Sequence, residues 1–243
     1  MATVHDAIIN KLQDHSEFDD ADRTAIRALP HWERTLAPNE DVVRQGDKPK
    51  AAVVVIAGVV ARYHTLRSGR RQYLSLHIAG DMPDAQAMFL ETMDHAVCAL
   101  GQAAVSLIPH DSLLALFKAQ PNAGAAIWRE TLIDAAIFRE AITNNSARPL
   151  PTRMAHFFCE QYYRARAGGH AQAGACRLPL TQVQLGEVLG ASLPSINRAL
   201  RALRRTRTMT FEGGELRIND WARMAELGDF NAGYLRARKV RRL

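Results

Sequence analysis

Short apolar runs alternate with turn-forming residues between positions 35 and 108, which is typical of antiparallel strands. Strands are expected at residues 52–56, 59–65, 73–78 and 103–108, with turns at residues 67–70 and 80–81. The first run is β-branched and bounded by Gly58, and the third alternates apolar and polar side chains with the period of a half-buried strand. Strands this short and closely spaced predict a small antiparallel β-roll of the jelly-roll type.

Apolar residues recur at helical spacing on both sides of this region. Helices are expected at residues 19–29, 111–118, 121–143 and 152–166, the second of them capped by Asp111. The third would be about 24 residues and ~36 Å long. Its apolar side chains cover more than one face, and one stripe holds Trp128, Leu132, Ala135 and Ile142. We expect this helix to pack on its own β-roll and on a second copy of itself, the alternative being a helix buried within a monomer.

The pattern divides the chain into three parts and predicts an α+β fold. Residues 1–118 would form the β-roll, residues 119–147 a dimerisation helix, and residues 148–243 a second domain. The boundary between the last two parts falls at the proline-containing residues 144–151. A loop of small residues is expected from Gly168 to Arg177.

Residues 180–205, LTQVQLGEVLGASLPSINRALRALRR, have the layout of a helix-turn-helix. Thr181 and Gln184 predict a capping box for the first helix, and Gly190 allows the sharp turn. Ser192 is expected to cap the second helix. Pro194 falls within the first turn of the second helix, where no intrahelical N–H is lost. The packing positions are Leu185, Gly186, Leu189, Ile196, Ala199, Leu200 and Leu203. Because all these features occur in register, we prefer this interpretation to a helical hairpin with a solvated basic face.

The outward face of the second helix carries polar and basic side chains. A recognition helix places its N-terminal residues against base edges in the major groove, and arginine binds guanine bidentately. We therefore expect Arg198 to contact a base, with Ser195 and Asn197 as lesser base contacts. Phosphate contacts are expected from Thr181, Ser192, Arg201, Arg204 and Arg205.

Two short apolar runs follow the helix-turn-helix, at residues 209–211 and 216–218, and the sequence EGGE separates them. They predict a two-stranded hairpin, which makes the motif a winged helix-turn-helix. The basic run at residues 236–242 is either a phosphate-binding tail or a disordered, solubilising end.

Charge is divided unevenly along the 243 residues. Residues 1–147 carry 14 basic and 18 acidic side chains, whereas residues 148–243 carry 17 basic and 7 acidic ones. The basic side chains of the second part are nearly all arginine, which favours binding to a polyanion. Composition alone leaves DNA, RNA and an anionic membrane open.

No segment indicates secretion, a membrane span or a cofactor. Hydrophobic residues make up 47% of the chain, which excludes a disordered protein, yet no apolar stretch approaches the ~20 residues of a membrane span. Residues 1–12 lack the apolar run of a signal peptide, and the three cysteines (Cys98, Cys159 and Cys176) form no CxxC pair. The histidines lack metal-ligand spacing, and neither a nucleophile elbow nor a P-loop is present. We expect a cytoplasmic protein with reduced thiols and with no metal, cofactor or catalytic residue.

Over most of its length the chain resembles the Crp/Fnr family of bacterial transcription regulators. The strongest motif starts with Leu-Thr, turns at a glycine, and carries the Asn-Arg pair of the second helix. Residues 43–47, 55–58 and 78–81 are similar to the glycine-bearing turns of the family's β-roll. The resemblance implies a homodimer that binds a palindromic operator near a promoter, with RNA polymerase as a further partner. Two-fold symmetry would place the recognition helices one DNA turn, ~34 Å, apart.

The β-roll departs from the cyclic-nucleotide-binding members of this family. Those members hold the ribose with a Gly-Glu pair and the phosphate with an Arg-Ser or Arg-Thr pair. The corresponding stretches here are Asp-Ala-Gln at residues 84–86 and Asp-His-Ala at residues 94–96. Ala85 has no carboxylate, and His95 with Ala96 does not replace a permanently charged guanidinium. Cyclic AMP is therefore not expected as the effector.

Two further departures limit what the resemblance implies. The oxygen-sensing branch needs an N-terminal cysteine cluster for its iron–sulfur centre, and the first cysteine here is Cys98. Leu193 and Pro194 stand where the cyclic-AMP regulators have Arg and Glu, so their operator half-site is not transferred.

The sequence thus favours a homodimeric, sequence-specific DNA-binding regulator without enzymatic activity. Two alternatives stay open: a cyclic-nucleotide-responsive regulator with an atypical pocket, and a cupin-like metalloenzyme with a basic domain. The effector, the operator sequence and the choice between activation and repression are not encoded in any motif found here.

Overall fold

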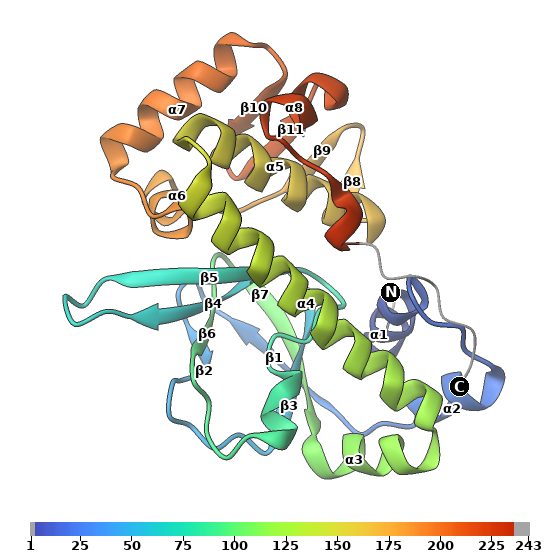
Figure 1. The fold of residues 1–243 in the computed structure, drawn as a ribbon. Coiled ribbons are helices and arrows are strands. Elements are labelled where there is room, and N and C mark those ends of the chain that lie inside the picture. The colour runs from blue at the N-terminus through green and yellow to red at the C-terminus, as the bar shows by residue number, and fades with distance from the viewer. Residues whose placement is uncertain (1–2, 236–243) are drawn as a thin grey trace. The chain divides into compact units, whose positions relative to one another are not determined.

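The computed structural model describes residues 3–235, and Figure 1 labels the helices and strands. Within these residues the chain forms two compact units. Unit 1 comprises residues 3–64 and 76–135, and unit 2 comprises residues 65–75 and 136–235. The basic run at residues 236–242 lies outside the described residues.

Unit 1 is an antiparallel β-roll with helices packed on it, as the apolar pattern predicts. The helices are α1 (Val4–Gln13), α2 (Asp20–Arg27), the 3-10 helix η1 (Ala85–Phe89), α3 (His110–Ala119) and the first part of α4 (Pro121–Ala147). The strands are β1 (Trp32–Leu36), β2 (Asp41–Val43), β3 (Ala51–Ala57), β4 (Val60–Thr65), β5 (Arg71–His77), β6 (Ala96–Ala99) and β7 (Ala103–Pro109), and of β5 only residues 76–77 fall in unit 1. They form two sheets with the strand orders β1-β7-β3 and β2-β6-β4-β5.

Strand β3 is buried on both faces, which explains its unbroken β-branched sequence. Ala52 and Val54 face a cluster of apolar side chains from α1 to α4. Val53 and Val55 face the opposite way, into a cluster shared by the strands of both sheets. One strand therefore joins the helical layer to the interior of the roll.

Two local predictions in unit 1 are wrong. The polar positions of β5 are not exposed, because Tyr73, Ser75 and His77 are all buried, and His77 Nδ1 lies 3.8 Å from a carboxylate oxygen of Asp81. Asp111 does not cap α3, since that helix already begins at His110 and places the carboxylate inside its first turn. Helix α1 and strands β1, β2 and β6 were not among the predicted elements.

Unit 2 is a winged helix-turn-helix preceded by the end of α4. Its elements are α5 (Leu150–Ala167), β8 (Ala171–Gln172), β9 (Ala175–Arg177), α6 (Gln182–Leu189), α7 (Leu193–Arg205), β10 (Met209–Glu212), β11 (Glu215–Ile218), α8 (Trp221–Leu227) and the 3-10 helix η2 (Ala232–Leu235). The strands form one sheet in the order β10-β11-β9-β8. The predicted loop before Arg177 is thus wrong: it is a hairpin whose turn, at Ala173 and Gly174, has positive φ at both residues.

Helix α4 is a single helix of 27 residues, four residues longer at its C-terminal end than predicted (Figure 1). The buried side chain of Asn144 holds this end, because its amide donates to the carbonyl of Arg153 on α5 at 3.1 Å. Arg148 then joins three segments through ion pairs with Glu140 (2.7 Å) and Asp229 (3.0 Å). None of the helices within residues 3–235 has the length and apolarity needed to span a lipid bilayer.

Candidate functional site

The turn between α6 and α7 has the local geometry that the sequence predicts. Thr181 Oγ1 accepts from the backbone N–H of Gln184 at 3.2 Å, and the Gln184 side chain accepts from the N–H of Thr181 at 2.9 Å. Gly190 adopts the left-handed conformation, with φ of 61°. A Cβ on Gly186 would lie 2.7 Å from the carbonyl oxygen of Ala191, so glycine is required where the turn folds back on α6. The capping box, the glycine turn and the close approach are confirmed.

Ser192 occupies the N-cap position of α7, but its side chain does not cap the helix. The backbone N–H of Ser195 bonds to the carbonyl of Ser192 at 2.9 Å, which leaves the Ser192 hydroxyl to lie 3.0 Å from the Ser195 hydroxyl. Arg198 Nη2 donates to that same Ser195 Oγ at 2.9 Å. Ser192 is thus the N-cap residue, as predicted, but without a side-chain hydrogen bond to the helix, and the three side chains form a hydrogen-bonded chain along the start of α7 instead.

The two faces of α7 differ sharply in burial. Ile196, Ala199, Leu200 and Leu203 are buried in unit 2. Arg198, Arg201 and Arg205 are exposed, and no carboxylate within residues 3–235 forms an ion pair with them. This exposed face has the chemistry for binding phosphates and base edges.

The remaining predicted contact residues differ in their exposure and in their hydrogen bonds. Thr181 is exposed at the start of α6, and Asn197 is half-buried on α7. Arg204 Nη2 donates to the carbonyl of Phe211 at 2.8 Å, so part of its donor capacity holds the wing strand β10. Leu193, which is 42% exposed at the first position of α7, was not among the predicted contact residues. Its place directly after the N-cap residue, at the start of the predicted recognition helix, is the signal that could have identified it.

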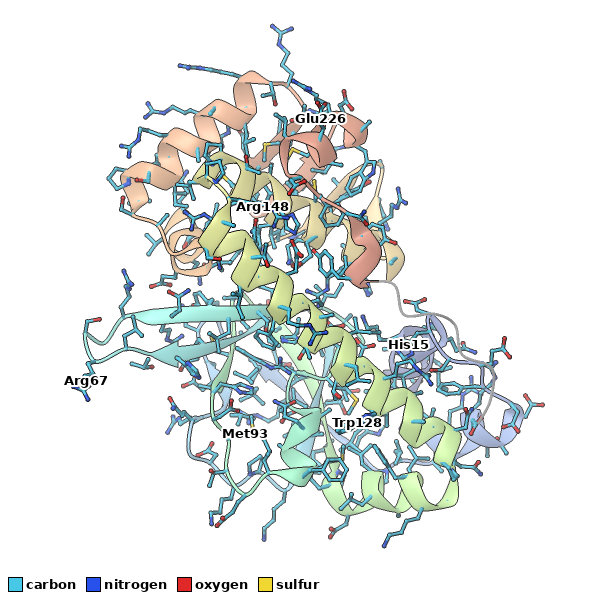
Figure 2. All side chains as sticks on the ribbon, in the orientation of Figure 1. His15, Arg67, Met93, Trp128, Arg148 and Glu226 are labelled. Carbon is cyan, nitrogen blue, oxygen red and sulfur yellow. The ribbon has the colours of Figure 1, made fainter. Side chains whose placement is uncertain are left out.

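The predicted apolar stripe of α4 is largely uncovered. Trp128 and Leu132 are each 53% exposed and Ile142 is 69% exposed, whereas Ala135 is half-buried (Figure 2 labels Trp128). Phe89 of η1, which is also exposed, packs edge-to-face on Trp128 with ring centroids 6.4 Å apart. This surface, Trp128, Leu132, Ala135 and Ile142, is called the α4 stripe below.

The opposite face of α4 carries Glu130 and Asp134, whose carboxylates form ion pairs with other side chains of unit 1. Glu130 lies 3.2 Å from Lys11 Nζ and 2.9 Å from Nε2 of His15, a residue labelled in Figure 2. Burial by itself would raise the pKa of Glu130, but Lys11 and His15 outweigh it and hold the pKa below its usual value. One turn later, Asp134 forms an ion pair with the buried guanidinium of Arg62.

The three predicted effector-pocket residues are all buried in the β-roll. Ala85 is 3%, His95 4% and Ala96 5% exposed. The Nδ1 atom of His95 lies 2.8 Å from the Asp94 carboxylate, while its Nε2 has no hydrogen-bond partner within the described residues. Burial, and then the nearby charge of Arg62, lower the pKa of His95. Arg62, a lone arginine in the buried, otherwise apolar part of β4, was not among the predicted site residues.

No group of three or more metal-ligating side chains exists in the part of the chain that the structure describes. The three cysteines, all within the described residues, are buried, and no disulfide joins any two of them. Burial raises the pKa of Cys159 to about 12 and that of Cys176 to about 11. Neither of these two thiols is activated as a nucleophile.

Two family models match the chain. The cyclic nucleotide-binding domain matches residues 33–120, and the Crp-like helix-turn-helix domain matches residues 152–227. The first match covers most of the β-roll, and the second covers α5 to α8 together with the wing.

Known proteins resemble the chain over nearly its whole length. The anaerobic regulatory protein of Aggregatibacter actinomycetemcomitans is 25% identical over 88% of this chain and 81% of its own. The transcriptional activator protein FnrA of Stutzerimonas stutzeri is 24% identical over 82% of this chain and 81% of its own. The structure of FixK2 from Bradyrhizobium japonicum has the same fold, with a TM-score of 0.72 at 23% identity, over 82% of this chain and 98% of that one.

Asp84 makes the stability of unit 1 depend on pH. Burial raises its pKa to about 7, so the folded state keeps a proton that the unfolded chain, with a carboxyl pKa near 3.8, has lost. The stabilising contribution of that proton is therefore lost as the pH rises from about 4 to about 7. An Asp84→Asn variant keeps an oxygen to accept the 2.7 Å hydrogen bond from the N–H of Val53 and does not ionise. We expect urea denaturation to show the variant gaining stability relative to the wild type as the pH rises from 5 to about 7.

The exposed Asp111→Asn variant serves as the control and should follow the wild type at every pH. Parallel pH curves for Asp84→Asn and the wild type would contradict the assignment of this titration to Asp84.

Proposed function

The chain belongs to the Crp/Fnr family of bacterial transcription regulators, and we propose that it acts as a homodimer whose two α7 helices bind a palindromic DNA operator. The observation that carries this proposal is the exposed arginine face of α7, in a chain that also exposes the α4 stripe. Members of this family are DNA-binding regulators and not enzymes, so the cupin-like metalloenzyme is no longer a rival.

In the proposed complex, the start of α7 contacts bases in the major groove. Arg198 binds guanine, and Ser195 and Asn197 supply smaller base contacts. Leu193 is exposed beside them, and its apolar side chain suits contact with a thymine methyl group. Phosphate contacts come from Thr181, Ser192, Arg201 and Arg205, and to a smaller degree from Arg204, which is shared with the wing.

The α4 stripe supports the proposed dimer. Large exposed apolar side chains that repeat along one helix indicate an interface with another protein surface. Their 3.5-like spacing suits a parallel pairing of two identical helices, which a two-fold axis would generate. Such a dimer presents two identical recognition helices, and a palindromic operator presents two identical half-sites.

The proposal includes the cellular setting. A regulator of this kind works in the bacterial cytoplasm, where it meets both chromosomal DNA and RNA polymerase. Cyclic AMP is not its effector, because Ala85, His95 and Ala96 lack the carboxylate and the guanidinium that a ribose and a phosphate require.

Replacing Arg198 by alanine should weaken binding to the specific operator by about 1–3 kcal/mol. The physical reason is the loss of a bidentate contact to a base, which non-specific DNA does not offer in the same register. The operator is first obtained by selection from random duplexes, and affinities are then measured by fluorescence anisotropy. Arg201→Ala is the matched control and should weaken specific and non-specific binding alike. Equal losses on both DNAs for Arg198→Ala would argue against base recognition.

Replacing Leu132 by glutamate should convert the dimer to a monomer, because it buries a charge in the centre of the α4 stripe. Sedimentation velocity would report the change in mass directly. Leu66→Glu, at another exposed leucine outside α4, should remain dimeric. If Leu132→Glu sediments as the wild type does, the two protomers do not meet through this stripe.

A further inference from the structure

Arg62 occupies the interior of the domain that matches the cyclic nucleotide-binding model. Its Nε donates to the carbonyl of Pro83, and its Nη2 lies 3.5 Å from Oε1 of Gln86. Its positive charge also acts on Asp84 and on His95. The guanidinium therefore contacts residues 83 and 86 and is near enough to His95 to lower its pKa, so it acts on both stretches of the candidate pocket, residues 84–86 and 94–96.

The same guanidinium binds the long helix. Arg62 Nη1 forms an ion pair with Asp134 on α4, and the side chain of Arg62 is only 3% exposed. A buried charge persists only where its hydrogen bonds are satisfied, and Arg62 has acceptors on the segment before η1 and on α4. One side chain thus connects strand β4, the candidate pocket and the dimerisation helix.

The charges around Arg62 are unfavourable for an anionic nucleotide. Asp134 pairs with it, Asp84 is buried beside it, and Asp94 approaches the same region through its contact with His95. A cyclic phosphate would have to displace Asp134 from the guanidinium and would also approach the Asp94 carboxylate. Asp84 keeps its proton below about pH 7 and adds a negative charge only above that pH.

We propose that Arg62 takes the place of a small-molecule effector, filling the candidate pocket and holding α4 through Asp134 so that the protein binds its operator without a cyclic nucleotide. This inference rests on the proposed function and concerns how that function is controlled. Because the guanidinium of Arg62 is part of the chain, its effective concentration near Asp134 is high. The ion pair between the β-roll and α4 therefore forms without a ligand.

A second set of ion pairs on the same face of α4 supports the proposal that Arg62 and Asp134 hold this helix. Glu130 precedes Asp134 by four residues, so both carboxylates lie on one side of the helix. Lys11 and His15 bind Glu130, while Arg62 binds Asp134. Two consecutive turns of α4 are therefore fixed to unit 1 by ion pairs, and the α4 stripe is left free on the other side.

The test uses the full-length protein and the operator selected with it. Arg62→Met removes the charge but keeps an apolar stem in the core, and Asp134→Asn removes the partner charge with little change of shape. Arg44→Met, at a β-roll arginine whose side chain is 78% exposed, is the matched control. Operator affinity is measured by anisotropy with and without millimolar cyclic AMP or cyclic GMP. Sedimentation and thermal denaturation identify a temperature at which each variant is folded.

We expect the wild type to bind the operator equally well with and without either nucleotide. Arg62→Met and Asp134→Asn should each weaken operator binding about tenfold or more. The operator affinity of the double variant should be no lower than that of the single variant that binds less tightly, because both substitutions remove the same ion pair. Arg44→Met should bind as the wild type does.

Three results would overturn the inference. The first is a rise of about tenfold in the operator affinity of the wild type when cyclic AMP or cyclic GMP is added. The second is binding of either nucleotide to the wild type, measured by calorimetry. Neither of these two measurements requires a variant to fold. Alternatively, a folded, dimeric Arg62→Met or Asp134→Asn could bind the operator with unchanged affinity, which would make the ion pair only structural. The proposed function fails in a different way, when the wild type selects no DNA sequence with or without nucleotide, and the inference then fails with it.

Discussion

Helix α4 forms ion pairs along one face and exposes large apolar side chains along another, and the rest of the structure depends on this division. One face carries Glu130 and Asp134, each ion-paired to a basic side chain of the β-roll or of α1. The other face carries the α4 stripe, whose large side chains remain in water in a single chain. Ion pairs fix the first part of the helix to unit 1, and in the proposed dimer the hydrophobic effect would drive a second copy to cover the stripe.

The DNA-binding surface follows from how α7 is held. Its apolar face is buried in unit 2, so the arginines must point outward, and Gly186 and Gly190 allow the tight turn that sets its direction. The hydrogen bond from Arg198 to Ser195 orders the guanidinium before DNA arrives. Pre-ordering reduces the side-chain entropy lost on binding. One recognition helix contacts only a few bases, so in the proposed complex specificity for a longer operator would depend on the dimer.

Strong local signals made the sequence predictions succeed, and their absence explains the failures. The β-branched run of β3, the capping box at Thr181 and the glycine turn at Gly190 each favour one local conformation, and all three are confirmed. Strands β8 and β9 have two and three residues, too few to show a period of two. The role of Arg62 could not be predicted, because its partner Asp134 lies 72 positions away and only the tertiary fold brings them together.

The spacing of the two half-sites on DNA tests the central claim most directly. Two copies joined along α4 must present their recognition helices to the same side of the duplex, about one helical turn apart. Inserting about 5 base pairs at the centre of the selected operator turns one half-site to the opposite side of the duplex. The account predicts that this insertion abolishes specific binding, measured by anisotropy against the uninterrupted operator. Unchanged affinity for the interrupted operator, or full affinity for one isolated half-site, would contradict it.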